Sequence, residues 1–175
     1  MKIAIYGFMG AGKTGLGKAL AERLGIPFVD LDEEIEKDNK LSINEIFDNH
    51  GEIAFRKTEH KILKKIVKHS TENIILSLGG GSILQPVNRR ILQLSGFKTV
   101  YLNVDINELI QRLKNDKDKR PLLKNIDDDK FEQYVTALYE SRKKIYEKYA
   151  ETEIKIYREN FETTLERLYL YFNFN

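Results

Sequence analysis

The sequence lacks several features that would each point to a particular class of protein. It contains no cysteine, which excludes disulfides and cysteine-ligated metal sites. Lysine and arginine total 29 against 27 acidic residues, and a net charge of +2 provides no general positive field for binding nucleic acid. No apolar run approaches the length of a membrane span, and the segment before the first glycine is too short for a signal peptide. We therefore expect a cytoplasmic protein whose partners include neither nucleic acid nor a membrane.

The chain also has no internal repeat, low-complexity tract or long linker. Its 175 residues suffice for one domain that buries about 70% of its unfolded surface. Segments near residues 2–6, 26–30, 73–78, 98–104 and 152–157 have the length and composition of strands, and helical patterns separate them. This alternation predicts an α/β fold whose parallel sheet is covered by helices on both faces.

Local signals mark the starts of two helices and the core faces of two others. Ser42 and Glu45 have the spacing of a capping box, and Asp105 with Glu108 offers a similar arrangement after the fourth strand. Residues 114–119 form the most polar interval and are expected in a mobile loop. The core stripe expected near residues 160–172 comprises Phe161, Leu165, Leu168 and Phe172. The stripe expected on the preceding helix comprises Phe131, Val135, Leu138, Ile145 and Tyr149.

Residues 7–14 (GFMGAGKT) lie between the first strand and the first helix, which is the context of a phosphate-binding P-loop. Glycines in such a loop allow backbone N–H groups to face the anion, and the start of the helix adds partial positive charge. Lys13 is expected to bridge the outer phosphates, and the Thr14 hydroxyl to bind magnesium. The alternative is an ordinary glycine turn followed by a surface lysine, which the complete motif disfavours.

Two aspartates follow the second strand. Asp30 and Asp32 are two residues apart, so in an extended chain both face the crevice where ligands of open α/β sheets bind. Beside bound phosphates, one carboxylate would lie near magnesium and the other would accept a proton from an attacking hydroxyl. The alternative is a pair of helix-capping acids for the segment that starts at Glu33.

Glycines and arginines supply the remaining candidates. Residues 79–81 are three glycines at the end of the third strand, where they either form a flexible turn or let a ligand reach backbone N–H groups. Arg142 lies on an apolar stripe, which favours an anionic partner over a snorkelling side chain. Arg56 carries less signal, because Glu59 one turn later would explain it. Arg120 precedes a proline and apolar residues, which is typical of a loop that closes over phosphates rather than of a solvated charge run.

Taken together, these segments resemble the shikimate kinase family, a nucleoside-monophosphate-kinase-like P-loop group. The resemblance covers nearly the whole chain. The matching segments are GFMGAGKT (7–14), FVDLDEEIE (28–36), SINEIF (42–47), GEIAFRKTE (51–59), LSLGGGSI (76–83), RPLL (120–123) and YESRKKIYEKYA (139–150), which includes R-x-x-x-Y. It implies a three-layer P-loop kinase fold with a five-stranded parallel sheet in the order 2-3-1-4-5. It also implies one kinase domain over residues 1–175, a substrate-binding region at about 31–61 and a mobile lid at about 112–125.

The same resemblance implies an activity and a role for each matching residue. The family transfers the γ-phosphoryl group of ATP to the 3-hydroxyl of shikimate, with Mg²⁺ as cofactor, in the pathway to chorismate and the aromatic amino acids; a monomer is expected. Implied for ATP are Gly10, Ala11, Gly12, Lys13, Thr14, Gly15, Arg112 and Arg120. Implied for shikimate are Asp32, Arg56, Gly79, Gly80, Gly81 and Arg142. The implied catalytic residues are Asp32, Lys13 and Arg120, and the implied metal ligands are Thr14 and Asp30. Asp32 would hold the acceptor hydroxyl and act as base or only position it, while Arg56 and Arg142 would grip the carboxylate.

Two departures and two rival functions qualify this interpretation. Gly15 in the first helical turn carries a modest local cost in stability, and the lysine- and aspartate-rich stretch between Arg112 and Arg120 leaves the adenine contacts open.

A related kinase acting on gluconate or a nucleoside monophosphate would share the P-loop and the lid, and would differ in the acceptor pocket. A non-catalytic nucleotide sensor on the same fold would be expected to lack Asp32, Arg120 or a carboxylate-binding arginine.

Overall fold

A computed structural model describes residues 1–70 and 72–173 and contains one five-stranded parallel sheet. The strands are β1 (Lys2–Gly7), β2 (Phe28–Asp30), β3 (Ile74–Ser77), β4 (Lys98–Val104) and β5 (Thr152–Ile156). Their spatial order, β2-β3-β1-β4-β5, confirms the predicted topology. The bounds of β4 agree with the sequence prediction, whereas β2 begins at Phe28, two residues later than predicted, and ends at Asp30 as predicted.

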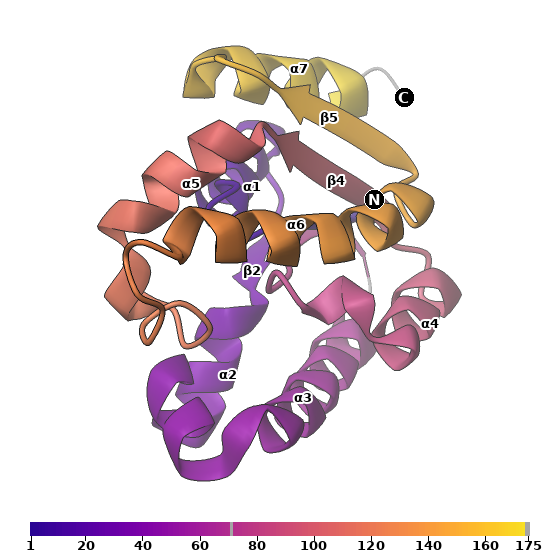
Figure 1. The fold of residues 1–175 in the computed structure, drawn as a ribbon. Helices are drawn as coiled ribbons and strands as arrows, with labels where there is room; N and C mark the ends of the chain where they lie inside the picture. The colour runs from indigo at the N-terminus through magenta and orange to yellow at the C-terminus, as the bar shows by residue number, and fades with distance from the viewer. Residues whose placement is uncertain (71, 174–175) are drawn as a thin grey trace.

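Helices cover both faces of the sheet (Figure 1). They are α1 (Lys13–Leu24), α2 (Leu31–Asn39), α3 (Ile43–His69), α4 (Pro86–Leu94), α5 (Ile106–Asn115), α6 (Phe131–Lys148) and α7 (Phe161–Asn173), with short 3-10 turns at η1 (Ser82–Leu84) and η2 (Lys117–Lys119). Alternation along β1 explains the layers. Ile5 points toward Gly17 of α1, whereas the ring of Tyr6 lies against Tyr146 of α6, because successive side chains of a strand leave on opposite faces.

The predicted helix starts are confirmed. Ser42 caps α3 and accepts a hydrogen bond from the backbone of Glu45, whose carboxylate in turn accepts one from the backbone of Ser42. Asp105 caps α5 through its carboxylate, which accepts from the backbone N–H groups of Asn107 and Glu108. Each cap satisfies backbone donors that the first helical turn leaves without a partner.

A part of the molecule formed by α2 and α3 projects beyond the end of β2, and the loop after α5 approaches it in Figure 1. Two contacts hold this loop against the start of α3. Lys124 pairs with Asp48, and the amide of Asn44 donates to the backbone oxygen of Asp118. α3 itself bends at Gly51, where the backbone leaves helical geometry. The α2–α3 part and the loop after α5 therefore meet beyond the carboxyl ends of the strands.

Two predicted core faces need correction. Phe161 is 47% exposed, so it lies outside the α7 core face, which consists of Thr164, Leu165, Leu168 and Phe172. On α6 the buried residues are Phe131, Val135, Tyr139, Arg142 and Tyr146. The predicted Leu138, Ile145 and Tyr149 are only half-buried. The face of α6 that packs on the sheet is rotated about the helix axis from the predicted one and carries Tyr139 and Tyr146. Arg142 remains on the buried face, as predicted.

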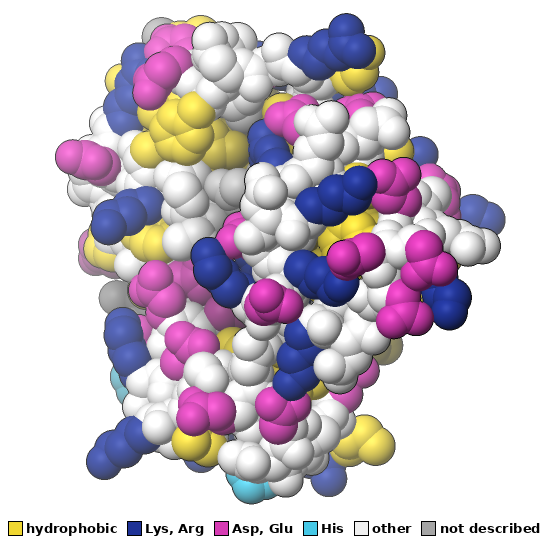
Figure 2. Space-filling model, turned by 60° about the vertical axis from the view of Figure 1, so that its left-hand side comes forward, with side chains coloured by type: hydrophobic (Ala, Val, Ile, Leu, Met, Phe, Trp, Pro, Cys, Tyr) yellow, Lys and Arg dark blue, Asp and Glu magenta, His cyan; other side chains and the backbone are white. Residues whose placement is uncertain are grey.

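No helix within residues 1–70 and 72–173 is long and apolar enough to cross a membrane. Figure 2 shows basic and acidic side chains interspersed over the face that it presents, in keeping with the near-neutral net charge.

Candidate active site

The phosphate-binding loop leaves β1 at Gly7 and enters α1 at Lys13. Gly12 caps α1 with φ of 83°, a left-handed conformation that residues with a Cβ rarely adopt. The ammonium group of Lys13 donates to the backbone oxygen of Phe8 at 3.1 Å, which folds the side chain back over its own loop. The start of α1 and the lysine charge thus face the same space, as binding of a polyphosphate requires.

Asp30 caps a helix, which was one of the two alternatives in the sequence analysis, and also contacts the phosphate-binding loop. One carboxylate oxygen caps α2 by accepting from the backbone N–H groups of Asp32 and Glu33, and the other accepts from the Thr14 hydroxyl at 2.6 Å. The expectation that Asp30 and Asp32 share an extended segment is wrong, because α2 begins at Leu31. Asp32 lies in the first turn of that helix, and both carboxylates nevertheless line one cavity.

The pair formed by Thr14 and Asp30 has the chemistry of a magnesium site. Its donors are hard oxygens, and Mg²⁺ in nucleotide sites commonly takes only one or two protein ligands, with phosphates and waters completing the shell. Within the described residues, no cluster of three or more histidine, cysteine or acidic side chains has the geometry to hold a metal on its own. Any magnesium held by Thr14 and Asp30 would therefore arrive with a nucleotide.

A cavity of about 370 Å³ opens along the phosphate-binding loop. Arg112 of α5 reaches over this loop and donates to the backbone oxygen of Gly10 at 2.9 Å, while Glu108 one turn earlier pairs with the same guanidinium. The predicted ATP and metal residues that line this cavity are Gly10, Gly12, Lys13, Thr14, Gly15, Asp30, Arg112 and Arg120. Ala11, within the loop, is buried and does not line this cavity.

A second, smaller cavity of about 80 Å³ adjoins the first. All six residues implied for shikimate line it: Asp32, Arg56, Gly79, Gly80, Gly81 and Arg142. Its remaining walls, which the sequence analysis did not identify, include Met9, Ile43, Phe47, Phe55, Glu59, Pro121 and Leu122. Asp32 and Arg120 line both cavities, so they stand at the junction between the two.

Each of the three glycines after β3 meets a different part of the site. A Cβ at Gly79 would lie 2.8 Å from a carboxylate oxygen of Asp32, and one at Gly81 would lie 2.7 Å from the Cζ of Arg56. A Cβ at Gly80 would lie 3.3 Å from the backbone nitrogen of Met9, in the phosphate-binding loop. A side chain at any of residues 79–81 would displace a neighbouring group of the site, because the site packs directly against this backbone.

Arg56 has the partner that the sequence suggested. Its guanidinium pairs with the fully buried Glu59 at 3.0 Å and with Glu52 at 3.1 Å, and Glu59 also accepts from the Ser82 hydroxyl at 2.6 Å. Burial raises the pKa of Glu59, while the nearby Arg56 charge acts in the opposite direction. The ion pair orients Arg56 along the cavity wall, so the structural and the ligand-binding interpretations are compatible.

Arg142 and Arg120 differ from Arg56 in having no acidic partner among the described residues. Arg142 is only 8% exposed, and its guanidinium lies 5.8 Å from the ring centroid of Phe8. The Nε atom of Arg120 is buried without a hydrogen-bond partner. A buried guanidinium that lacks an anion is unfavourable, so Arg142 could pair with an anionic group of a ligand, and so could the buried Nε of Arg120.

Two ionisable groups that line the cavity along the phosphate-binding loop have pKa values moved toward neutrality. Burial, helped by the charge of Asp30, raises the pKa of Asp32 from 3.8 to about 6, and Lys13 opposes the shift. Burial lowers the pKa of Lys13 from 10.5 to about 8 against the attraction of Asp32. Such values suit a carboxylate that accepts a proton near neutral pH beside a lysine that remains charged.

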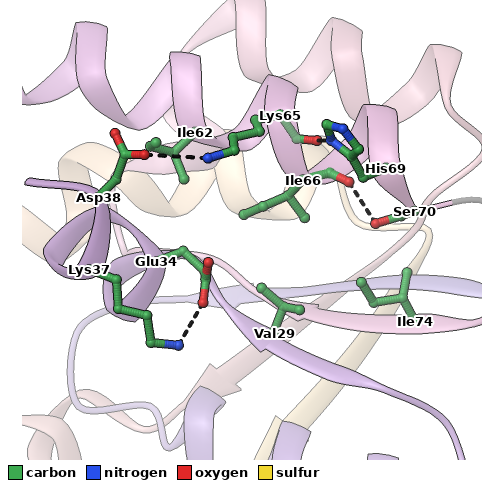
Figure 3. Close-up of a pocket in the computed structure, with 10 residues that line it drawn as sticks. All are labelled: Val29, Glu34, Lys37, Asp38, Ile62, Lys65, Ile66, His69, Ser70 and Ile74. Carbon is green, nitrogen blue, oxygen red and sulfur yellow. Dashed lines mark hydrogen bonds and ion pairs between the residues drawn. The ribbon is translucent and has the colours of Figure 1, made fainter.

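Another cavity, of about 570 Å³, lies elsewhere (Figure 3). It opens between α2, the second half of α3 and strands β2 and β3, and none of the predicted site residues lines it. Its floor is apolar, with Val29, Ile62, Ile66 and Ile74. Its lysines are already paired, Lys37 with Glu34 and Lys65 with Asp38 (Figure 3). Among the described residues that line this cavity, none carries the uncompensated charge that marks the other two.

Comparison with known proteins gives one consistent result. The family model described as Shikimate kinase matches residues 9–169. A shikimate kinase of Flavobacterium johnsoniae is 37% identical over 94% of this chain and 95% of its own. One of Flavobacterium psychrophilum is 42% identical over 77% of each chain. Among solved structures, a shikimate kinase from Acinetobacter baumannii in complex with shikimate has a TM-score of 0.87 at 34% identity, over 99% of this chain and 94% of that one.

Proposed function

The chain belongs to the shikimate kinase family and uses ATP to phosphorylate shikimate, and on that premise we propose which of its residues carry out the transfer. The supporting observation is the junction of two cavities: Asp32 and Arg120 line both, the first cavity carries the P-loop and the second carries two arginines. We assign ATP to the larger cavity and shikimate to the smaller one.

On the ATP side, Lys13 and Arg120 neutralise the phosphate oxygens, and the backbone N–H groups at the start of α1 hold them. Arg112 contacts the nucleotide above the loop, since it already lies over Gly10. Thr14 and Asp30 are the ligands offered to Mg²⁺, which when bound supplies further neutralisation of the phosphates. The unpartnered Nε of Arg120 supports its assignment to the transferred group.

On the acceptor side, Arg56 and Arg142 bind the shikimate carboxylate through paired hydrogen bonds. This places the 3-hydroxyl beside Asp32, whose pKa of about 6 suits acceptance of a proton at neutral pH. The hydroxyl oxygen forms a bond to the γ-phosphorus, its proton passes to Asp32, and the bond from the γ-phosphorus to the bridging oxygen breaks to release ADP. The glycines at 79–81 provide the surface against which the ring lies.

Further assignments extend the proposal beyond the site. Residues 31–61 form the substrate-binding region and residues 112–125 the lid of a single kinase domain, supported by the contacts of Lys124 and Asn44 across the mouth of the site. A closed lid excludes water that would otherwise accept the phosphoryl group. We also expect a cytoplasmic monomer.

The experiment is ATP consumption with and without shikimate, followed by the same assay on two variants of Arg142. Arg142→Ala should abolish shikimate-dependent turnover, and Arg142→Lys should raise the KM for shikimate far more than the KM for ATP, because the lysine has no fork to match a carboxylate. An equal rise in both KM values would contradict the assignment. Gluconate and nucleoside monophosphates serve as control acceptors, and turnover with either would favour a different kinase of this group.

A further inference from the structure

Tyr146 in α6 joins two parts of the acceptor pocket that come from distant segments. Its hydroxyl donates to the backbone oxygen of Gly80 at 2.5 Å, at the centre of the glycine loop. The charge of Arg142, one turn earlier on the same face of α6, favours the ionised form of the same hydroxyl. Burial raises the pKa of Tyr146 to about 12 despite the arginine, so the phenol remains a donor.

The ring of Tyr146 has little freedom to move. It packs against Tyr6 and Tyr101, with ring centroids 6.0 and 5.3 Å away, and is fully buried. The backbone oxygen of Tyr146 accepts from the hydroxyl of Tyr6 at 2.7 Å. Since Tyr6 directly precedes the phosphate-binding loop, α6 is tied both to that loop and to the glycine loop through one residue.

Gly80 is well placed to transmit this constraint. It packs against the backbone of Gly7 and Met9, while Gly79 faces Asp32 and Gly81 faces Arg56. A small displacement of the loop would therefore alter the positions of Asp32 and Arg56 together. A displacement of α6 would move Arg142 relative to both.

We propose that Tyr146 is a positioning residue for the phosphoryl acceptor: its hydroxyl sets the distance between the carboxylate-binding Arg142 and the glycine loop. This rests on the proposed function, which places the acceptor in the same pocket. A buried tyrosine hydroxyl needs an acceptor wherever it lies, and here that acceptor belongs to the wall of the site. The R-x-x-x-Y spacing follows from the helix, since residues four apart lie on one face.

The test compares Tyr146→Phe with Tyr139→Phe. Both tyrosines are buried on α6 and each donates one hydrogen bond, but that of Tyr139 goes to the Asn103 side chain at 2.9 Å, outside the acceptor pocket. Tyr146→Phe should raise the KM for shikimate about tenfold, the effect of losing one well-placed hydrogen bond, and leave the KM for ATP within about twofold. Tyr139→Phe should leave both KM values within about twofold of those of the unmodified protein. The urea midpoints of the two variants should fall by similar amounts, because each loses one buried hydrogen bond.

A rescue variant separates positioning from packing. p-Aminophenylalanine at position 146 keeps a donor to the Gly80 oxygen on a ring of nearly the same size, so it should restore a KM for shikimate close to that of the unmodified protein. It also keeps the proposal testable should Tyr146→Phe fail to fold.

Three results would overturn the inference: an unchanged shikimate KM in Tyr146→Phe, an equal rise in both KM values, or the same rise in Tyr139→Phe. A tenfold rise that persists with p-aminophenylalanine would do the same. Failure of the proposed function is distinguishable from all of these, because Arg142→Lys, with Tyr146 unchanged, would then raise the KM for ATP as much as the KM for shikimate.

Discussion

Replacing Asp32 by asparagine should stabilise the unliganded protein while it abolishes most of the activity. The carboxylate lies at the junction of two cavities, where burial raises its pKa from 3.8 to about 6. A raised pKa means that the folded state disfavours the ionised form. Asparagine keeps the size of the side chain and carries no charge, so it removes that unfavourable interaction.

The magnitude follows from the pKa difference. From 3.8 to about 6, at about 1.4 kcal/mol for each pH unit, the ionised carboxylate costs about 3 kcal/mol at neutral pH. Part of this cost is screened, because Asp32 is partly exposed, and asparagine also loses the attraction to Lys13 and Arg120. It further removes an acid from the first turn of α2, worth about 0.3–1 kcal/mol. We therefore expect a net gain of about 1–2 kcal/mol at pH 8.

The sign of the pH dependence is opposite to that of an ordinary paired carboxylate. Between pH 3.8 and about 6 the folded wild-type protein binds more protons than the unfolded chain, so its stability falls as the pH rises through this window. Below about pH 4 the side chain of Asp32 is neutral in both the folded and the unfolded wild-type protein, so the greater stability of the variant should disappear. Above about pH 7 it should be fully present.

Urea denaturation followed by circular dichroism, from pH 4.5 to 8 without nucleotide or divalent cations, measures this difference. Glu33→Gln is the matched control, since Glu33 is an exposed acid in the same helical turn and reports the helix-dipole contribution alone. In the same variant of Asp32, affinity for ADP should remain near normal while turnover falls by about 10²–10⁴-fold.

A stability difference between Asp32→Asn and wild type that is the same at pH 4.5 and pH 8 would refute the reasoning. So would a variant that is less stable at pH 8 than Glu33→Gln. Either result would mean that the carboxylate is well solvated or well paired in the unliganded state. Near-normal turnover would instead remove Asp32 from the catalytic assignment and leave the stability argument intact.

Three further perturbations test other parts of the site. Because the pKa of Lys13 is lowered to about 8, affinity for ADP should decrease as the pH rises beyond that value, and Lys13→Met should bind weakly without this dependence; titration calorimetry measures both. Gly81→Ala displaces Arg56 and should raise the KM for shikimate about tenfold, with the KM for ATP unchanged as the internal control. Thr14→Val should raise the Mg²⁺ concentration needed for half-maximal activity about tenfold, and an unaltered requirement would exclude the hydroxyl as a ligand.

Several parts of the site could be predicted from sequence because they depend on neighbours along the chain. The P-loop at residues 7–14 needs only a strand, glycines and a helix start, and the caps at Ser42 and Asp105 use donors within one helical turn. The inward position of Arg142 could be inferred from its place on an apolar stripe. Periodicity and capping act over a few residues, so one sequence reveals them.

Reasoning from neighbouring residues failed to predict which face of a helix is buried and where a helix begins. The predicted stripe of α6 missed Tyr139 and Tyr146, because several apolar faces compete on that helix and only the position of the sheet decides among them. The extended path expected through Asp32 was wrong, since Asp30 caps α2 and the helix begins at Leu31, one residue before Asp32. Phe161 was assigned to the core on periodicity alone, although it begins its helix outside the packed face.

By itself the sequence determined the phosphate-binding loop, the alternation of strands and helices, and the set of charged residues available for chemistry. Only the tertiary structure decided which of them meet: Asp32 with Gly79, Arg56 with Gly81, and Tyr146 with Gly80. The physical reason is distance along the chain. Residues 66 positions apart, such as Tyr146 and Gly80, come together only through the strand order and the helical crossovers, whose stability is a property of the whole packed core.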